Sequence, residues 1–91
     1  MSKFLITYDL NSPGQKHKEF SELIVKLFPK HINYWETSYL IDTNLNAEEI
    51  MTRLKHLLDN NDCVLVSEVT GRFNGWFTDK ERKEIHSFFK S

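Results

Sequence analysis

The stretch Phe4-Leu5-Ile6-Thr7-Tyr8-Asp9 decides the fold expected of this chain, and the turn-forming stretch Asn11-Ser12-Pro13-Gly14 follows it closely. Aromatic, aliphatic and β-branched residues favour a half-buried strand, and the Pro-Gly pair predicts a turn. Asp9 therefore ends a strand at the rim of a sheet, where a carboxylate is held rigidly, is open to solvent and can bind a metal ion or a proton. The plainer interpretation is that Asp9 only starts the turn, which is a common role for aspartate.

The length and composition indicate one small globular domain. The chain has 91 residues, of which 40% are hydrophobic and 27% are charged. We therefore expect a single domain over residues 1–91, with residues 70–91 as a C-terminal extension. Twelve Lys and Arg residues oppose thirteen Asp and Glu residues. This balance excludes the dense basic surface that strong nonspecific nucleic-acid binding needs. A local basic patch is still compatible with a near-neutral net charge.

Cysteine content and hydropathy indicate the cellular compartment of the protein. Cys63 is the only cysteine, which excludes an internal disulfide and a cysteine-based zinc site. The sequence does not open on a charged and then apolar leader, and no apolar run approaches the ~20 residues that span a bilayer. We therefore expect a cytoplasmic protein that does not enter a membrane.

Residue spacing predicts the other elements. A helical period runs over residues 20–28 and is expected to stop at Pro29. Residues 31–42 are rich in aromatic and β-branched residues and predict two strands, with their turn near Glu36-Thr37. A continuous, buried-looking strand is expected over residues 63–69.

Two helix starts are predicted by capping residues. Asn46 stands three residues before Glu49, and Thr78 stands three residues before Glu81. This spacing allows the side chains of each pair to cap the first turn of a helix. We therefore expect a helix after Asn46 and a final helix after Thr78.

The order of these elements predicts the architecture. A β-α-β-β-α-β order is typical of the ferredoxin-like α+β fold, with a four-stranded antiparallel sheet, and here a C-terminal helix is appended. Right-handed crossovers place the first two helices on one face of the sheet and leave the other face open. Aromatic residues make up 13% of the chain, and a large exposed apolar face usually marks an interface. We therefore expect a homodimer with two-fold symmetry.

The same topology predicts what surrounds Asp9. The first strand is central and antiparallel to the third and fourth strands, so its end should lie near Thr37-Ser38 and Asp62. Carboxylates and a hydroxyl would then meet at one rim. Magnesium is commonly held by one or two carboxylates together with water and phosphate oxygens, and two-fold symmetry could add a second Asp9.

These residues also resemble a known family. Tyr8-Asp9 closing the first strand, Glu36-Thr37-Ser38 before the third and Asp62 opening the last resemble the small CRISPR-associated endonuclease and integration-scaffold family. The chain is still more similar to SinR-like short proteins, and more distantly to VapD-type toxins, over about residues 3–69. The resemblance implies a ferredoxin-like homodimer in which Asp9 binds a metal ion that activates water against a phosphodiester. It places the hydroxyl-bearing catalytic position at Ser38.

Two functions from different classes follow. The first is metal-dependent cleavage of nucleic acid, with Asp9 from each copy holding magnesium or manganese, which lowers the pKa of a bound water. The second is a non-catalytic homodimer that binds a nucleotide, an oligonucleotide messenger or a protein partner. The near-neutral charge favours this second function, as does the absence of the arginines that the family commonly carries after the aspartate. A purely structural adaptor is a third possibility.

The segment 71–77 supplies recognition residues for the second function. Arg72 lies among aromatic residues, and such a combination can hold a base and its phosphate. The candidate ligand-binding residues are Tyr8, Asn11, Arg72 and Trp76. In the plainer interpretation, Phe73 and Trp76 pack onto the partner or under the last helix, while Arg72 points to water.

Overall fold

A computed structural model describes residues 1–11 and 14–90, apart from the side chain of Tyr34. Ser12 and Pro13, the middle of the turn predicted over Asn11-Ser12-Pro13-Gly14, lie outside the described residues. The elements are β1 Ser2–Asp9, α1 Gln15–Leu27, β2 His31–Trp35, β3 Ser38–Thr43, α2 Ala47–Leu54 with a short 3₁₀ turn Lys55–Leu57, β4 Cys63–Val69 and α3 Asp79–Lys90.

The four strands form one antiparallel sheet in the order β2-β3-β1-β4. The β1 strand is central: Leu5 is opposite Leu40 on β3 and opposite Ser67 on β4. The hairpin between β2 and β3 turns at residues 36–37, as predicted. The predicted α+β architecture with a four-stranded antiparallel sheet is therefore confirmed.

Alternate residues of β1 fill the core. Phe4, Ile6 and Tyr8 are buried on the face that α1 and α2 cover, because side chains of a strand alternate between its two faces. They join the buried residues Phe20, Ile24, Ile50 and Leu54 of the two helices. Each such side chain contributes about 1.5–3 kcal/mol when it leaves water. This cluster therefore fixes which face of β1 turns away from the helices.

The predicted helix caps are present. The Oδ1 atom of Asn46 accepts from the backbone N of Glu49 at 2.8 Å, and a Glu49 carboxylate oxygen accepts from the backbone N of Asn46 at 2.9 Å. Thr78 and Glu81 make the same reciprocal pair before α3. The α1 helix starts instead from Gly14, whose φ of 91° suits glycine.

The β4 strand departs from the sequence expectation. It was expected to be buried throughout, but its exposure alternates, and Leu65 is 60% exposed. We use "second face" for the side of the sheet that is turned away from α1 and α2. Leu65 is exposed because it lies on this face of the edge strand β4, where no described helix covers it.

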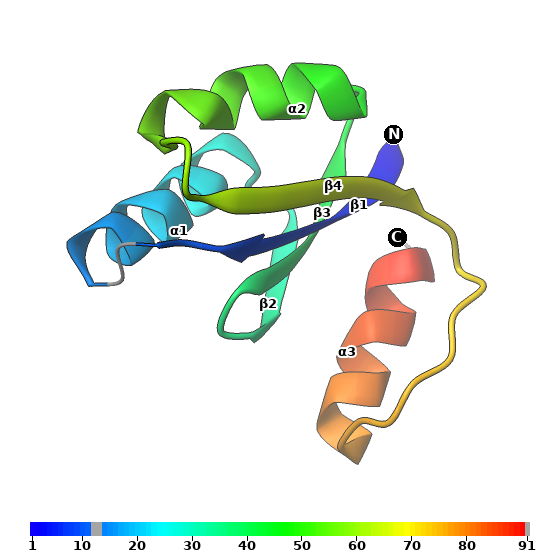
Figure 1. Cartoon of the computed structure of the whole chain (residues 1–91). Coiled ribbons are helices and arrows are strands. Elements are labelled where there is room, and N and C mark those ends of the chain that lie inside the picture. The colour runs from blue at the N-terminus through cyan, green and yellow to red at the C-terminus, as the bar shows by residue number, and fades with distance from the viewer. Residues whose placement is uncertain (12–13, 91) are drawn as a thin grey trace.

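The C-terminal part of the chain covers the other end of that second face. After β4, residues 70–78, here called the strap, run without regular structure to α3, so that α2 and α3 lie on opposite sides of the sheet (Figure 1). Ile85 of α3 is buried there, and Phe88 and Phe89 are half-buried. The prediction that the second face stays open is therefore wrong at this end.

No helix in residues 1–11 and 14–90 has both the length and the apolar character needed to cross a membrane.

Candidate functional site

Asp9 lies where the sequence predicts, at the exposed end of β1. It is opposite Cys63 of β4, and it shares the second face with Thr7, two residues earlier. A hollow of about 250 Å³ opens there, and its lining includes Thr7, Asp9, Cys63 and Leu65. The Asp9 carboxylate is thus accessible at the uncovered end of the second face.

Ser38 lies near Asp9, but its hydroxyl makes a hydrogen bond to another residue. Its Cα is opposite that of Thr7, and its hydroxyl donates to Oγ1 of Thr7 at 3.3 Å. Ser38 is buried. The structure therefore places Ser38 and Asp9 on the same face with Thr7 between them, and the Ser38 hydroxyl is already hydrogen-bonded.

Asp62 is held by other groups at the start of β4. Its carboxylate accepts from Lys16 Nζ at 2.6 Å, from the backbone N of Asn11 at 2.8 Å and from the backbone N of Asp59 at 3.0 Å. These hydrogen bonds, led by that of Lys16, lower the pKa of Asp62 from 3.8 to about 2. In the described part of the chain, no three His, Cys, Asp or Glu residues are grouped so that they could hold a metal ion. One copy therefore offers Asp9 alone at this rim.

Tyr8 faces away from Asp9. It is 4% exposed in the core, and its hydroxyl donates to the carbonyl oxygen of Glu36 at 3.4 Å. Burial raises the pKa of Tyr8 to about 12, and the nearby Tyr39 adds to this effect. Tyr8 thus lies on the helix-covered face, while Asp9 lies on the second face.

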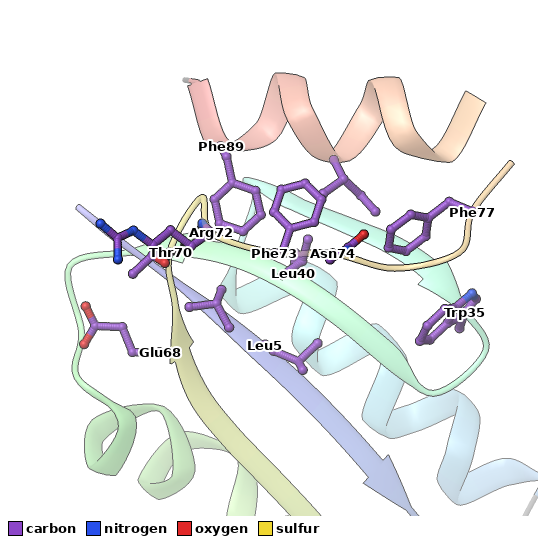
Figure 2. Close-up of a pocket in the computed structure, with 12 residues that line it drawn as sticks. Leu5, Trp35, Leu40, Glu68, Thr70, Arg72, Phe73, Asn74, Phe77 and Phe89 are labelled. Atoms are coloured by element: carbon purple, nitrogen blue, oxygen red, sulfur yellow. Dashed lines mark hydrogen bonds between the residues drawn. The ribbon is translucent and has the colours of Figure 1, made fainter. Parts of the chain in front are cut away.

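The larger site is a cavity of about 480 Å³ between the second face and α3. Leu5, Leu40 and Val69 line it from three neighbouring strands, and Ile85 and Phe89 line it from α3. Figure 2 shows Phe89 pointing from α3 toward Leu5 and Leu40 on the sheet. The strap supplies its side wall. A space of this size, mainly apolar and with a few polar groups, is typical of sites that enclose one small molecule.

Aromatic rings form two pairs along this cavity. Phe73 stacks on Phe89 with ring centroids 5.2 Å apart, and Phe77 stacks on Trp35 at 6.4 Å. The Phe77 ring also lies against the backbone of Gly75: a Cβ atom there would be only 2.5 Å from Cζ of Phe77. Glycine at position 75 therefore allows the strap to turn Phe77 toward Trp35.

Polar groups gather at the opposite end of the cavity from Trp35. Figure 2 places Glu68, Thr70 and Arg72 at this end, and Asn74 lies between the two ends. The backbone N of Arg72 donates to Oγ1 of Thr70 at 3.2 Å, which holds the strap at its first turn. Within residues 1–11 and 14–90, the Glu68 carboxylate and the Arg72 guanidinium make no hydrogen bond or ion pair. Glu68, however, is opposite the buried Phe4 on β1, so its side chain lies on the face that α1 and α2 cover. Arg72 is therefore the charged side chain that the strap brings to this end of the cavity.

The four candidate ligand-binding residues do not lie together at one site in a single copy of the protein. Asn11 follows Asp9 at one end of β1, whereas Arg72 follows Val69, which is opposite Lys3 at the other end. Lys3 and Asp9 are six positions apart along β1, which is roughly 20 Å. Trp76 is 97% exposed and does not line the cavity. Of the four candidates, the cavity therefore takes in Arg72 alone.

Sequence reasoning missed two aromatic residues of the cavity, Trp35 and Phe77, neither of which is singled out as a ligand contact from the sequence. Trp35 is the last residue of β2 and Phe77 follows Gly75 by two residues, so the two positions share no signal in the sequence, and they meet only because the strap folds back. Phe73, by contrast, packs under α3, as the plainer interpretation predicted.

No family model matches this sequence, and no curated protein shows significant sequence similarity to it.

Proposed function

We propose that the protein is a non-catalytic binding module for a nucleotide or a short oligonucleotide, and that the cavity beneath α3 is its binding site. The observation that carries this proposal is the combination of four aromatic side chains with Arg72 around a space of about 480 Å³. Stacking of a base on an aromatic ring contributes about 1–3 kcal/mol. An arginine beside the rings can pair with phosphate through two parallel hydrogen bonds.

Calorimetry with the purified protein tests this function. The four nucleoside monophosphates and a set of linear and cyclic dinucleotides are titrated, first with magnesium and then with EDTA. We expect binding that survives the chelator and is weakened by Arg72→Ala. Arg53→Ala, an exposed arginine on α2 away from the cavity, is the matched control. The proposal fails if the whole panel is silent, or if Arg72→Ala binds as well as Arg53→Ala.

We also propose that the fold is ferredoxin-like and that two copies form a homodimer in the cytoplasm. The order β-α-β-β-α-β with a central β1 supports the fold. The exposed surface of 6165 Å² supports the dimer, because a compact monomer of this mass exposes only about 5,500 Å². The uncovered end of the second face around Leu65 is the surface that we assign to the partner copy.

Sedimentation across a concentration series tests the dimer. Leu65→Lys places a charge on the proposed interface and should shift the protein toward monomer. Val25→Lys introduces the same charge on the exposed side of α1, where we expect no change. A monomeric wild type, or equal behaviour of the two variants, would remove the dimer from the proposal.

A second candidate is the metal-dependent cleavage that the resemblance implies. It is favoured by one observation: Asp9 is exposed on the uncovered end of the second face, close to the proposed dimer surface. One chain supplies a single carboxylate, so the partner's Asp9 would complete a magnesium or manganese site. The Ser38 hydroxyl would have to leave Thr7 to take part.

Incubation of labelled RNA and duplex DNA with manganese, with and without chelator, tests this second candidate. Asp9→Asn should abolish cleavage, and Glu84→Gln on the exposed surface of α3 should keep it. Equal products from both variants, or products that persist in chelator, would exclude Asp9 from catalysis.

A further inference from the structure

We propose that β4 pairs with β4 of a second copy, antiparallel and in a register centred on Val66, so that the homodimer shares one continuous sheet. This inference rests on the proposed homodimer and adds the way in which the two copies meet. Three properties of β4 support it: its outer edge lacks the features that usually protect an edge strand, its open backbone groups match those of a second β4, and its side chains favour the same register.

The outer edge of β4 is unprotected, unlike the edge at β2. The order β2-β3-β1-β4 leaves these two strands at the edges of the sheet. Natural edge strands usually carry Pro or Lys, are short, contain a bulge or are covered by another element. The β2 strand has five residues and an irregular register between Asn33 and Trp35, and α3 packs against it. The β4 strand has seven residues, none of which is Pro, Lys or Arg, and pairs with β1 without an irregularity.

The hydrogen bonds of β1 show which backbone groups of β4 are open. The backbone N of Tyr8 donates to the carbonyl oxygen of Thr37 at 3.1 Å, so Tyr8 directs its backbone groups toward β3. These groups alternate in direction along a strand, so Thr7 directs its own toward β4, where Leu65 is opposite. The N–H and C=O groups of Leu65 therefore point to β1, and those of the residues on either side of it point to the outer edge.

Three residues of β4, Val64, Val66 and Glu68, thus direct an N–H and a C=O away from the sheet. In the described part of the chain no strand lies beside them, and the Glu68 carbonyl accepts a long hydrogen bond of 3.4 Å from the Ser67 hydroxyl. A second β4 supplies matching groups when the two-fold axis passes through Val66. Val66 then pairs with the partner's Val66, and Val64 pairs with the partner's Glu68. This register uses every open group, with two hydrogen bonds in each pair.

The side chains favour the same register. A register centred on Glu68 would set this carboxylate opposite the partner's Glu68, and like charges in that position are destabilising. Centred on Val66, the register sets Glu68 opposite the partner's Val64. On the second face, Leu65 then lies diagonally from the partner's Leu65, roughly 7–8 Å away and within reach of it. Leu65, which is 60% exposed in one copy, therefore becomes part of the interface.

This pairing also fixes the separation of the two Asp9 carboxylates. Asp9 is opposite Cys63 at one end of β4. With Val66 at the centre, Asp9 and the partner's Asp9 lie roughly six positions apart along the strands and three strand spacings apart across the sheet, which is about 25 Å. They are then too far apart to hold one metal ion. The edge pairing and a metal site shared by the two Asp9 residues therefore exclude each other.

Sedimentation of wild type, Val66→Pro and Val66→Ala across a concentration series tests the edge. Both variants replace the valine side chain, but only proline removes the N–H, which points to the outer edge and takes no part in the pairing with β1. We expect Val66→Pro to dimerise at least about tenfold more weakly than Val66→Ala, because two hydrogen bonds are lost at the axis. Circular dichroism checks that both variants fold. Equal dimerisation of the two folded variants would overturn the inference.

Disulfide cross-linking in a Cys63→Ser background tests the register without proline. Val66→Cys places its thiol opposite that of the second copy, with Cα atoms about 5.5 Å apart, which is within the range of a disulfide. Oxidation should therefore give a covalent dimer. Glu68→Cys is the matched control on the same strand, because its two copies lie four positions apart, about 13 Å along the strands. Equal cross-linking through the two positions, or none through Val66→Cys, would contradict the register.

The outcomes separate this inference from the proposals beneath it. A protein that is monomeric at every concentration removes the homodimer and the inference together. A stable dimer that does not cross-link through Val66→Cys keeps the homodimer and overturns the edge pairing alone. If Val66→Pro does not fold, the cross-link decides. Calorimetry tests the nucleotide-binding function independently, since Val66 does not line the cavity beneath α3.

Discussion

Lys16 and Asp62 join the first turn of α1 to the start of β4, with Nζ of Lys16 2.6 Å from Oδ2 of Asp62. The same ammonium lies 2.7 Å from Oδ2 of Asp59. The Asp62 side chain is 0% exposed. The ammonium thus bridges the two carboxylates, and the cluster connects the loop before β4 to α1.

This cluster predicts how stability depends on acid. The pKa of Asp62 is lowered from 3.8 to about 2, so the folded state favours the ionised carboxylate. The resulting stabilisation is complete above pH 3.8 and is lost as the pH falls toward about 2. Melting temperatures measured by circular dichroism from pH 7 to pH 2 should drop in this window for wild type.

Lys16→Met removes the largest cause of that shift and should flatten the drop between pH 4 and pH 2, from a lower melting temperature at pH 7. Lys18→Met is the control, because Lys18 is exposed on the same helix and outside the cluster. Parallel curves for Lys16→Met and wild type would show that Lys16 does not control the titration.

The capping box of α2 predicts a local stability effect. Asn46→Ala leaves the backbone N of Glu49 without its acceptor and should lower the free energy of unfolding by about 0.5–2 kcal/mol. Asn44→Ala, two residues earlier in an exposed position, should have almost no effect. Urea titration followed by circular dichroism measures both. Equal midpoints for the two variants would mean that the cap contributes nothing.

The core beneath α2 predicts a much larger effect. Leu54 is fully buried among residues of β1, α1 and β3, so Leu54→Ala should cost about 2–5 kcal/mol through lost apolar burial and the cavity left behind. Val25→Ala on the exposed side of α1 should stay within about 0.5 kcal/mol. The same urea titration compares them, and a loss at Leu54 no larger than that at Val25 would contradict the packing described.

The close approach of Gly75 to Phe77 predicts a spectroscopic change. A methyl group at position 75 would overlap the Phe77 ring, with Cβ 2.5 Å from Cζ, so Gly75→Ala must move that ring off Trp35. At Gly71, by contrast, an added Cβ would meet Phe89 at 4.0 Å, an ordinary contact.

Both variants are measured in a Trp76→Phe background, which leaves Trp35 as the only tryptophan. Gly75→Ala should shift the emission of Trp35 and weaken binding of the nucleoside monophosphates, while Gly71→Ala should change neither. An unchanged emission spectrum for Gly75→Ala would mean that Phe77 does not stack on Trp35 in solution.

Several elements of this fold were predictable from short-range signals. The alternation of β1, the capping pairs at Asn46 and Thr78, and the turn at residues 36–37 all depend on residues within a few positions of one another. Hydrogen bonds between an N-cap and N3, and the period of two in a strand, need no information from distant parts of the chain. These predictions are confirmed.

The site was less predictable, because its residues meet only through long-range packing. The prediction of Asp9 at the rim is correct. Nothing near Asp62 in the sequence, however, indicates that its carboxylate accepts a hydrogen bond from Lys16. Likewise, the sequence around Tyr8 does not show whether this residue lies at the rim or in the core, because that depends on the register of β1 with β3 and β4.

The amino-acid sequence alone determined the strands, the helix starts and the exposed carboxylate at Asp9, since these follow from local hydrogen bonding and from periodicity. Only the tertiary structure decided that α3 returns over Leu5 and Leu40 and encloses a cavity with Arg72 at one end. The reason is that the strap carries no periodic pattern, so its path is set by where Phe73 and Phe77 can pack against Phe89 and Trp35, and that surface exists only after the sheet has formed.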